Sequence, residues 1–298
     1  MSARGAAELL RSAQERLTAS GVLSPRADAE QLLAHVLEVD RLWARWGDPT
    51  PEQVARFTAL VDRRAAREPL QHLLGTAGFR RVELAVGPGV FVPRPETEVL
   101  AGWAVEQVSA RIGECSEPVV VDLCTGSGAI AAAVADEAPD ARVHAVELAS
   151  EAFAYAERNL LGAGVDLRLG DIADAFVDLD GTVDVVTANP PYIPLSAWES
   201  VAPEARDHDP AIALWAGVDG LDAIRAVEMV ASRLLRPGGV VGCEHADVQG
   251  QAASSVFAGT GRWVEVMDHD DLTGRPRFVT ARRARNATSA HHDDTMTS

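Results

Sequence analysis

Residues 119–130 read Val119-Val120-Val121-Asp122-Leu123-Cys124-Thr125-Gly126-Ser127-Gly128-Ala129-Ile130. The apolar run predicts a strand buried on both faces, and the glycines after it predict a tight turn into a helix. Glycine permits a positive φ, and its missing side chain lets a ligand lie directly against the backbone. In open α/β sheets, ligands bind at the carboxyl ends of strands, where the strand order reverses. This stretch therefore predicts an α/β fold with a ligand site at residues 122–128.

Outward from that turn, short apolar segments alternate with segments of helical periodicity. This pattern favours a mainly parallel sheet covered by helices on both faces. No helical segment separates the last two strands, so we expect them to form an antiparallel pair at one edge. A seven-stranded sheet with one reversed edge strand resembles the Rossmann-like fold of class I methyltransferases. The predicted strands are residues 119–123, 143–146, 165–169, 183–187, 239–243, 264–267 and 278–281.

The N-terminal part of the chain has a different pattern. Apolar residues recur there at helical spacing, and Ser24-Pro25 and Thr50-Pro51 are typical helix starts. Alternating apolar and polar residues, broken by glycines, then predict a β-hairpin. We expect a helical domain at residues 1–74, a hairpin linker at 75–96, an α/β domain at 97–284 and a disordered tail at 285–298.

Composition excludes several classes of protein. The net charge of −17 over 298 residues disfavours a broad nucleic-acid footprint, which needs clustered cations. Cys115, Cys124 and Cys243 lack zinc-ligand spacing, and a solvated tail is a better interpretation of His291-His292 than a metal site, so no metal is expected. No 18-residue apolar run and no signal peptide are present, which predicts a cytoplasmic protein without membrane contact.

Acidic residues at the next two strand ends point to the ligand. Glu147 lies 19 residues after Gly128, where a carboxylate can accept both ribose hydroxyls, although a solvated carboxylate is the alternative. The third glycine of a dinucleotide-binding turn is missing, which favours S-adenosylmethionine over a nicotinamide cofactor. In methyltransferases, an acidic residue at the position of Asp171 typically binds the adenine amino group; an Asx turn is the alternative. The expected cofactor contacts are Asp122, Cys124, Thr125, Gly126, Ser127, Gly128, Glu147, Asp171, Ile172 and Asn189.

The tetrapeptide Asn189-Pro190-Pro191-Tyr192 follows the fourth predicted strand. It is typical of enzymes that methylate a nitrogen conjugated to a π system. Two consecutive prolines make the segment extended and stiff, although such a loop can also be purely structural. We expect the Asn189 side-chain oxygen and the Pro190 carbonyl to accept the target N–H groups, and Tyr192 to pack on a planar group. Asn189, Pro190 and Tyr192 are the expected catalytic residues.

Two further segments accompany the tetrapeptide: Pro69-Leu70-Gln71-His72-Leu73-Leu74-Gly75 and Phe91-Val92-Pro93-Arg94-Pro95-Glu96-Thr97-Glu98. Together these motifs resemble the PrmC (HemK) family of release factor glutamine methyltransferases, over the chain up to about Arg283. The resemblance implies methylation of the glutamine N5 in the Gly-Gly-Gln motif of class 1 peptide chain release factors. It also implies substrate contacts by Phe91, Arg94, Asn189, Pro190, Pro191 and Tyr192, although Arg94 could instead form a salt bridge. Cys124 departs from the family, which usually has glycine there.

Two rival enzyme classes share the catalytic motif. A glutamine methyltransferase of a ribosomal protein would share the catalytic half, and only the N-terminal segments favour a release factor. A nucleic-acid adenine-N6 methyltransferase is disfavoured by the acidity of the chain. The side-chain amide nitrogen of a glutamine is a poor nucleophile. If the substrate is a glutamine, we therefore expect the enzyme to act chiefly by positioning it, without a strong general base.

Overall fold

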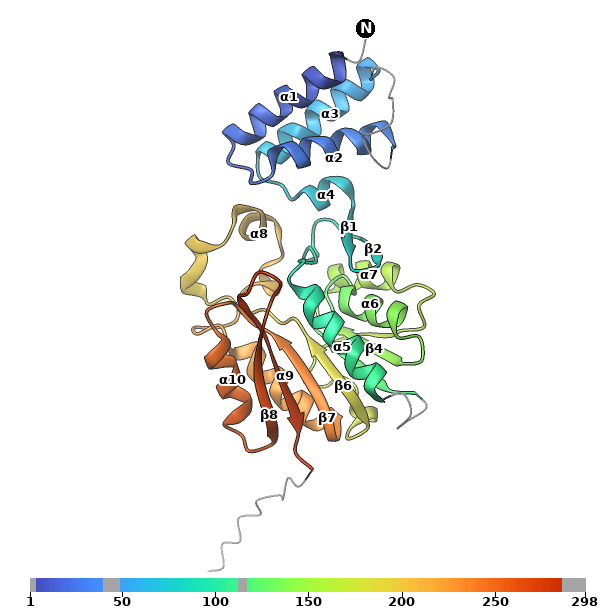
Figure 1. Ribbon diagram of the computed structural model, residues 1–298, viewed down its shortest axis with the longest axis vertical. Helices are drawn as coiled ribbons and strands as arrows, with labels where there is room; N and C mark the ends of the chain where they lie inside the picture. Colours follow the sequence, from blue (N-terminus) through green and yellow to red (C-terminus); the bar gives the residue numbers. More distant parts are fainter. Residues whose placement is uncertain (1–3, 40–48, 112–116, 286–298) are drawn as a thin grey trace, which may run out of the picture.

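The computed structural model describes residues 4–39, 49–111 and 117–285. In this part of the chain, a layer of N-terminal helices lies at one end of a sheet that is covered by helices on both faces (Figure 1). Cys115, His291 and His292 lie outside the described residues, as does almost all of the predicted tail. Among the described helices, none is long and apolar enough to cross a membrane.

The sheet has the strand order β5-β4-β3-β6-β7-β9-β8. All neighbouring pairs are parallel except β7 with β9 and β9 with β8. The class I methyltransferase fold is therefore confirmed, with one difference: the reversed strand, β9, lies one place in from the edge, between β7 and β8. The strands are β3 (Val119–Leu123), β4 (Arg142–Glu147), β5 (Asp166–Leu169), β6 (Val183–Ala188), β7 (Leu235–Glu244), β8 (Trp263–Asp270) and β9 (Pro276–Arg283).

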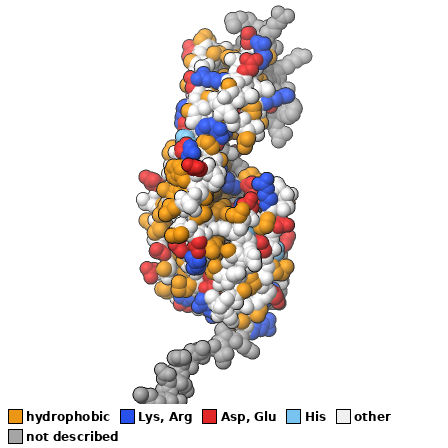
Figure 2. All heavy atoms as spheres, turned by 90° about the vertical axis from the view of Figure 1, so that its left-hand side faces the viewer, with side chains coloured by type: hydrophobic (Ala, Val, Ile, Leu, Met, Phe, Trp, Pro, Cys, Tyr) orange, Lys and Arg blue, Asp and Glu red, His pale blue; other side chains and the backbone are white. Residues whose placement is uncertain are grey.

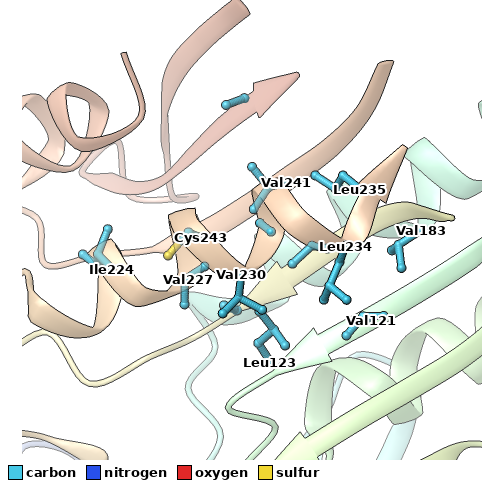
Figure 3. Close-up of a cluster of buried hydrophobic side chains, with 14 of the residues drawn as sticks. Val121, Leu123, Val183, Ile224, Val227, Val230, Leu234, Leu235, Val241 and Cys243 are labelled. Atoms are coloured by element: carbon cyan, nitrogen blue, oxygen red, sulfur yellow. The ribbon is translucent and has the colours of Figure 1, made fainter. Parts of the chain in front are cut away.

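Each central strand buries both of its faces. On one face of the sheet, Val121 and Val241 belong to the same hydrophobic cluster as Ile224 and Val227 of α9 (Asp222–Leu234) (Figure 3). The alternate residues, such as Val120, pack against the helices of the opposite face. This double burial explains why the strands read as continuous apolar runs. The helices around the sheet are α5 (Thr97–Arg111), α6 (Ala129–Glu137), α7 (Ser150–Asn159), α9 (Asp222–Leu234) and α10 (Gly250–Ala258).

The N-terminal helices have a hydrophobic core of their own, which includes Leu17, Leu32 and Phe57. Of the two predicted helix starts, Thr50 forms a full capping box with Gln53, whereas the Ser24 side chain makes no cap hydrogen bond. The elements here are α1 (Arg4–Ala19), α2 (Pro25–Leu37), α3 (Pro51–Ala65) and α4 (Leu70–Leu74), followed by the hairpin strands β1 (Thr76–Phe79) and β2 (Val82–Ala85).

One carboxylate joins the N-terminal helices to the rest of the molecule. Glu204 belongs to α8 (Pro203–His208), which lies below the helical layer in Figure 1. Its oxygens accept hydrogen bonds from Arg64 Nη2 at 2.9 Å and from Arg67 Nη2 at 2.7 Å. Burial opposes ionisation of Glu204, but the hydrogen bonds from Arg67 and Arg64 prevail and lower its pKa to about 2. Because Arg64 also pairs with Asp28 at 2.8 Å, a largely buried ionic cluster spans the junction.

Candidate active site

A cavity of about 380 Å³ opens at the carboxyl ends of β3 and β6. The strand order reverses between these strands, since β4 and β5 continue to one side of β3 while β6 and β7 lie on the other. This is the position at which open α/β sheets bind ligands. The predicted site residues in its wall are Phe91, Arg94, Cys124, Thr125, Gly126, Ser127, Glu147, Asp171, Ile172, Asn189, Pro191 and Tyr192.

Three predicted residues lie outside the cavity wall: Asp122, Gly128 and Pro190. Asp122 is buried below the turn, where it accepts hydrogen bonds from Thr125 Oγ1 at 2.6 Å and Thr187 Oγ1 at 2.8 Å. Burial raises the pKa of Asp122 to about 6. Gly128 has a φ of +85°, and a Cβ there would meet the Leu160 side chain at 3.1 Å. Asp122 and Gly128 therefore support the turn from the side that faces away from the cavity.

The turn itself leaves room for a ligand. Gly126 has a φ of +58°, and no atom lies within 4 Å of the point that a Cβ there would occupy. Glu147 ends β4 and holds the turn, because its Oε2 accepts a hydrogen bond from the Gly126 N–H at 2.8 Å and its Oε1 accepts one from Ala149 at 2.8 Å. Burial raises the pKa of Glu147. A carboxylate oxygen has two lone pairs, so each can still accept a further hydrogen bond from a ligand.

Asp171 follows β5 and lines the cavity together with Ile172. Its Oδ1 accepts a hydrogen bond from the Ala173 N–H at 2.9 Å, the short-range geometry of an Asx turn. Asp171 therefore does form the Asx turn that was the alternative interpretation, and it still lines the cavity. The predicted contact with the adenine amino group stays a prediction.

The tetrapeptide leaves the end of β6 and enters the cavity wall. Asn189 Nδ2 donates to Thr97 Oγ1 at 3.2 Å, and the Tyr192 hydroxyl donates to Glu244 Oε1 at 3.2 Å. The Tyr192 carbonyl accepts a hydrogen bond from Gln249 Nε2 at 3.0 Å, and burial raises the pKa of the Tyr192 phenol. The tetrapeptide is thus fixed by side-chain hydrogen bonds as well as by its prolines.

Comparison with known proteins places this arrangement in a family. Residues 8–75 match the family described as "PrmC N-terminal domain", and residues 120–208 match the family described as "Methyltransferase domain". A release factor glutamine methyltransferase of Streptomyces coelicolor is 56% identical over 276 residues, which cover 91% of this chain and 96% of that protein. One from Mycolicibacterium smegmatis is 48% identical, over 92% of this chain and 96% of its own length. The chain belongs to the PrmC family.

Two other similar proteins have names that differ from those of the release factor methyltransferases. A 4-amino-L-phenylalanine/4-methylamino-L-phenylalanine methyltransferase of Streptomyces pristinaespiralis is 43% identical over 86% of this chain and 88% of that protein. The catalytic domain of hMettl16, solved in complex with an RNA hairpin, superposes with a TM-score of 0.53 at 13% identity, covering 68% of this chain and 76% of that chain. The second likeness concerns the fold alone.

The PrmC segment at residues 91–98 contributes Phe91, Pro93, Arg94 and Thr97 to the cavity wall. The Arg94 guanidinium stands 4.7 Å from the centre of the Phe91 ring, and its Nη2 donates to Asp209 Oδ2 at 2.5 Å. The alternative interpretation of Arg94, a salt bridge, is therefore realised. Its partner Asp209 is buried, which raises the pKa of that carboxyl to about 6.

Several cavity residues were not predicted from the sequence. They are mostly small or apolar. Some flank predicted residues, such as Thr97, Ile130 and Ala149, and the others come from the start of α9 and from residues 193–214, a segment that contains the short helices at Leu195–Ser200 and Ala211–Ala213 and the helix α8. This segment lies far from the glycine-rich turn in sequence and has no motif of its own. The unpredicted residues include Ala205, Pro210, Ile212, Leu214, Ala223 and Ala226.

Cys124, where the resemblance to the PrmC family led us to expect glycine, has a backbone conformation that favours glycine. Cys124 has a φ of +58°, a conformation that costs a residue with a Cβ roughly 1 to 3 kcal/mol. The turn thus keeps the glycine-like conformation and Cys124 bears the strain. Burial raises the pKa of the Cys124 thiol, with further contributions from Glu147 and Asp122, so the thiol stays protonated.

We expect the substitution Cys124→Gly to stabilise the protein by about 1 kcal/mol, because glycine adopts this φ without strain. Cys124→Ala is the matched control, since it removes the sulfur but keeps the Cβ. Urea unfolding of the three proteins measures the difference. An alanine variant that is more stable than the glycine variant would show that the backbone at residue 124 is unstrained, because glycine loses more conformational entropy on folding.

Proposed function

We propose that the protein methylates the N5 amide nitrogen of the glutamine in the Gly-Gly-Gln motif of class 1 peptide chain release factors, and that it does so in the cytoplasm. The observation that carries this proposal is the position of Asn189. Its side-chain amide lies in the wall of the cavity that the glycine-rich turn also lines, in a rigid segment typical of nitrogen methylation. The Streptomyces and Mycolicibacterium relatives are named for this same reaction.

The cavity fits S-adenosylmethionine as the methyl donor. The space over Gly126 allows a ligand to lie on the backbone, and the two carboxylates Glu147 and Asp171 face the cavity from successive strand ends. Glu147 would bind the ribose hydroxyls, and Asp171 with Ile172 would hold the adenine. When bound, this cofactor supplies an electrophilic methyl group on a sulfonium.

The residues of the chain act mainly by holding the glutamine amide. Its nitrogen lone pair is delocalised into the carbonyl, so the reaction depends on alignment. Asn189 Oδ1 accepts one N–H, and we expect the backbone carbonyl of Pro190 to accept the other, although Pro190 itself lies outside the cavity wall. These two acceptors also stabilise the positive charge that develops on the nitrogen. Tyr192 packs against the planar amide, and the proton leaves to water after transfer.

We assign recognition of the release factor to the N-terminal helices and the segment 193–218. Figure 2 shows hydrophobic side chains gathered on the face that carries this segment. Leu195, Trp198, Ile212 and Val218 are all at least 49% exposed there, and Trp198 stacks on Trp215 at 5.1 Å. An apolar surface beside a catalytic cavity suits a protein substrate better than a small one.

The junction at Glu204 gives this assignment a test. In Glu204→Ala, Arg64 and Arg67 lose the carboxylate that ties the helical layer to the segment lining the cavity. We expect kcat/KM for release factor to fall about tenfold, the scale of one lost charge-assisted hydrogen bond, while the dissociation constant of S-adenosylmethionine stays unchanged. Steady-state kinetics and calorimetry measure the two quantities.

Glu157→Ala is the control, because Glu157 is an exposed glutamate of α7, outside the surface assigned to recognition. If Glu204→Ala and Glu157→Ala methylate release factor equally well, the junction has no part in substrate recognition.

The proposed function itself is tested by incubating the full chain with labelled S-adenosylmethionine and one acceptor at a time. The acceptors are release factor, its Gly-Gly-Gln→Gly-Gly-Ala variant, ribosomal proteins, adenine-containing DNA and 4-amino-L-phenylalanine. Label on the Gly-Gly-Gln glutamine, located by mass spectrometry, supports the proposal. Efficient labelling of the free amino acid instead would assign the chain to the chemistry of its S. pristinaespiralis relative.

A further inference from the structure

Two buried polar side chains lie beside the tetrapeptide: Thr97, which contacts Asn189, and Glu244, which contacts Tyr192. Thr97 is the first residue of α5 and Glu244 is the last residue of β7, so three separate elements meet here. Thr97 is 4% exposed and Glu244 is 1% exposed. Thr97 belongs to the segment at residues 91–98, but no sequence pattern explains the complete burial of either residue, and a buried carboxylate is costly unless hydrogen-bond donors surround it.

The donors around Glu244 are few. Tyr192 donates to Oε1, while Oε2 is buried without a partner of standard hydrogen-bond geometry in the described part of the chain. The adjacent Thr97 hydroxyl is the group whose hydrogen bonding most opposes the effect of burial on the carboxyl. Thr97 Oγ1 accepts a hydrogen bond from Asn189 Nδ2 at 3.2 Å, so the single hydroxyl hydrogen of Thr97 is free for another acceptor, and the unpartnered oxygen of Glu244 is one.

The same contact fixes the orientation of the Asn189 amide. If the Thr97 hydroxyl donates its hydrogen to Glu244, Thr97 Oγ1 can only accept from Asn189. The side chain of Asn189 therefore presents its NH₂ group to Thr97, as the 3.2 Å contact from Nδ2 shows. The amide oxygen Oδ1 is left on the other side, and Asn189 belongs to the cavity wall.

We propose that Thr97 and Glu244 are positioning residues that hold the Asn189 amide with its oxygen toward the substrate, so that the site selects a nitrogen bearing hydrogen. This inference rests on the proposed function, because it assigns a cause to the acceptor that the reaction requires. With the reverse orientation, Asn189 would present an NH₂ group to the NH₂ of the target glutamine, and the two donors would repel each other.

Protonation of Glu244 would allow the Asn189 amide to change its orientation. A protonated carboxyl carries its own hydrogen, so Thr97 no longer has to donate to it and the Asn189 amide can turn. Burial raises the pKa of Glu244 to about 7, opposed by Thr97, by the Arg277 guanidinium and by Tyr192, while Glu96 raises it further. Arg277 is itself paired with Asp271 at 3.4 Å. Methyl transfer should therefore rise with pH through about 7, as Glu244 ionises.

The first test compares Thr97→Val with Thr97→Ser in the full-length protein. Valine has the shape of threonine but no hydroxyl, so we expect kcat with release factor to fall about tenfold or more, with unchanged affinity for S-adenosylmethionine. Serine keeps the hydroxyl and should restore kcat to within a few-fold of wild type. Thr280→Val is the control, since Thr280 is a buried threonine of β9 that bonds His269 away from the cavity.

The second test uses Glu244→Gln, which keeps the shape and one acceptor oxygen but does not titrate. Its kcat should lose the rise near pH 7 that wild type shows, while remaining substantial at pH 8. Wild-type kcat in Thr97→Val, or an identical pH profile in Glu244→Gln and wild type, would overturn the inference. Failure of wild type to methylate release factor at all would instead overturn the proposed function.

Discussion

Asn189→Ala is expected to lower the turnover of release factor methylation by about 100-fold to 1000-fold, the cost of removing one preorganised polar partner of a transition state. The alanine keeps the backbone of the stiff segment, because Pro190 and Pro191 still restrict it. The lost group is the amide oxygen that would hold the target nitrogen. Single-turnover measurements with saturating cofactor report this step directly.

Cofactor affinity in Asn189→Ala should stay close to that of wild type, which calorimetry checks. Asn189→Asp refines the test, since it keeps an acceptor toward the cavity. Aspartate cannot donate to Thr97, however, and it brings a second carboxylate near Glu244, so we expect its activity to lie between alanine and wild type. If Asn189→Ala methylates release factor at a rate near that of wild type, the tetrapeptide has only a structural role.

Glu147→Ala should weaken the binding of S-adenosylmethionine by about 1.5 to 3 kcal/mol, the range for hydrogen bonds to a charged group. This corresponds to roughly 10-fold to 150-fold in the dissociation constant. The structure adds a second reason for a large effect. Glu147 also holds the Gly126 N–H, so its removal loosens the turn on which the cofactor lies.

Glu147→Gln separates the two contributions, because one amide oxygen remains to accept a hydrogen bond while the negative charge is lost. Calorimetric titration of both variants gives the affinities, and the unfolding midpoint without cofactor reports the loss of the turn. The same affinity in Glu147→Ala and wild type would remove Glu147 from the cofactor site.

Much of the fold could be predicted from the sequence because its determinants are local. The strand and turn at residues 119–128 need a continuous apolar run and glycines with positive φ, and both are visible in the letters. The two hairpin strands and the capping box at Thr50 follow from equally short patterns. The boundaries proposed for the domains stay predictions.

What the sequence could not provide was the contact between distant segments. The pairing of Arg94 with Asp209 joins residues 115 positions apart, and no local pattern favours one acidic partner over another. Glu244 is a different case. It follows a predicted strand just as Glu147 and Asp171 do, so the rule that located those two at the strand ends could have located it as well.

The ionic cluster at Glu204 has a consequence for how such proteins can be recombined. A chimera joined near residue 75 would take Arg64 and Arg67 from one parent and Glu204 from the other, although the three side chains form one hydrogen-bonded unit. The exchangeable module is therefore discontinuous: the first 74 residues travel together with helix α8. Chimeras that exchange both the first 74 residues and α8 should preserve the ionic cluster. Chimeras that exchange only the residues before the hairpin would preserve it only if both parents have a glutamate at the position of Glu204.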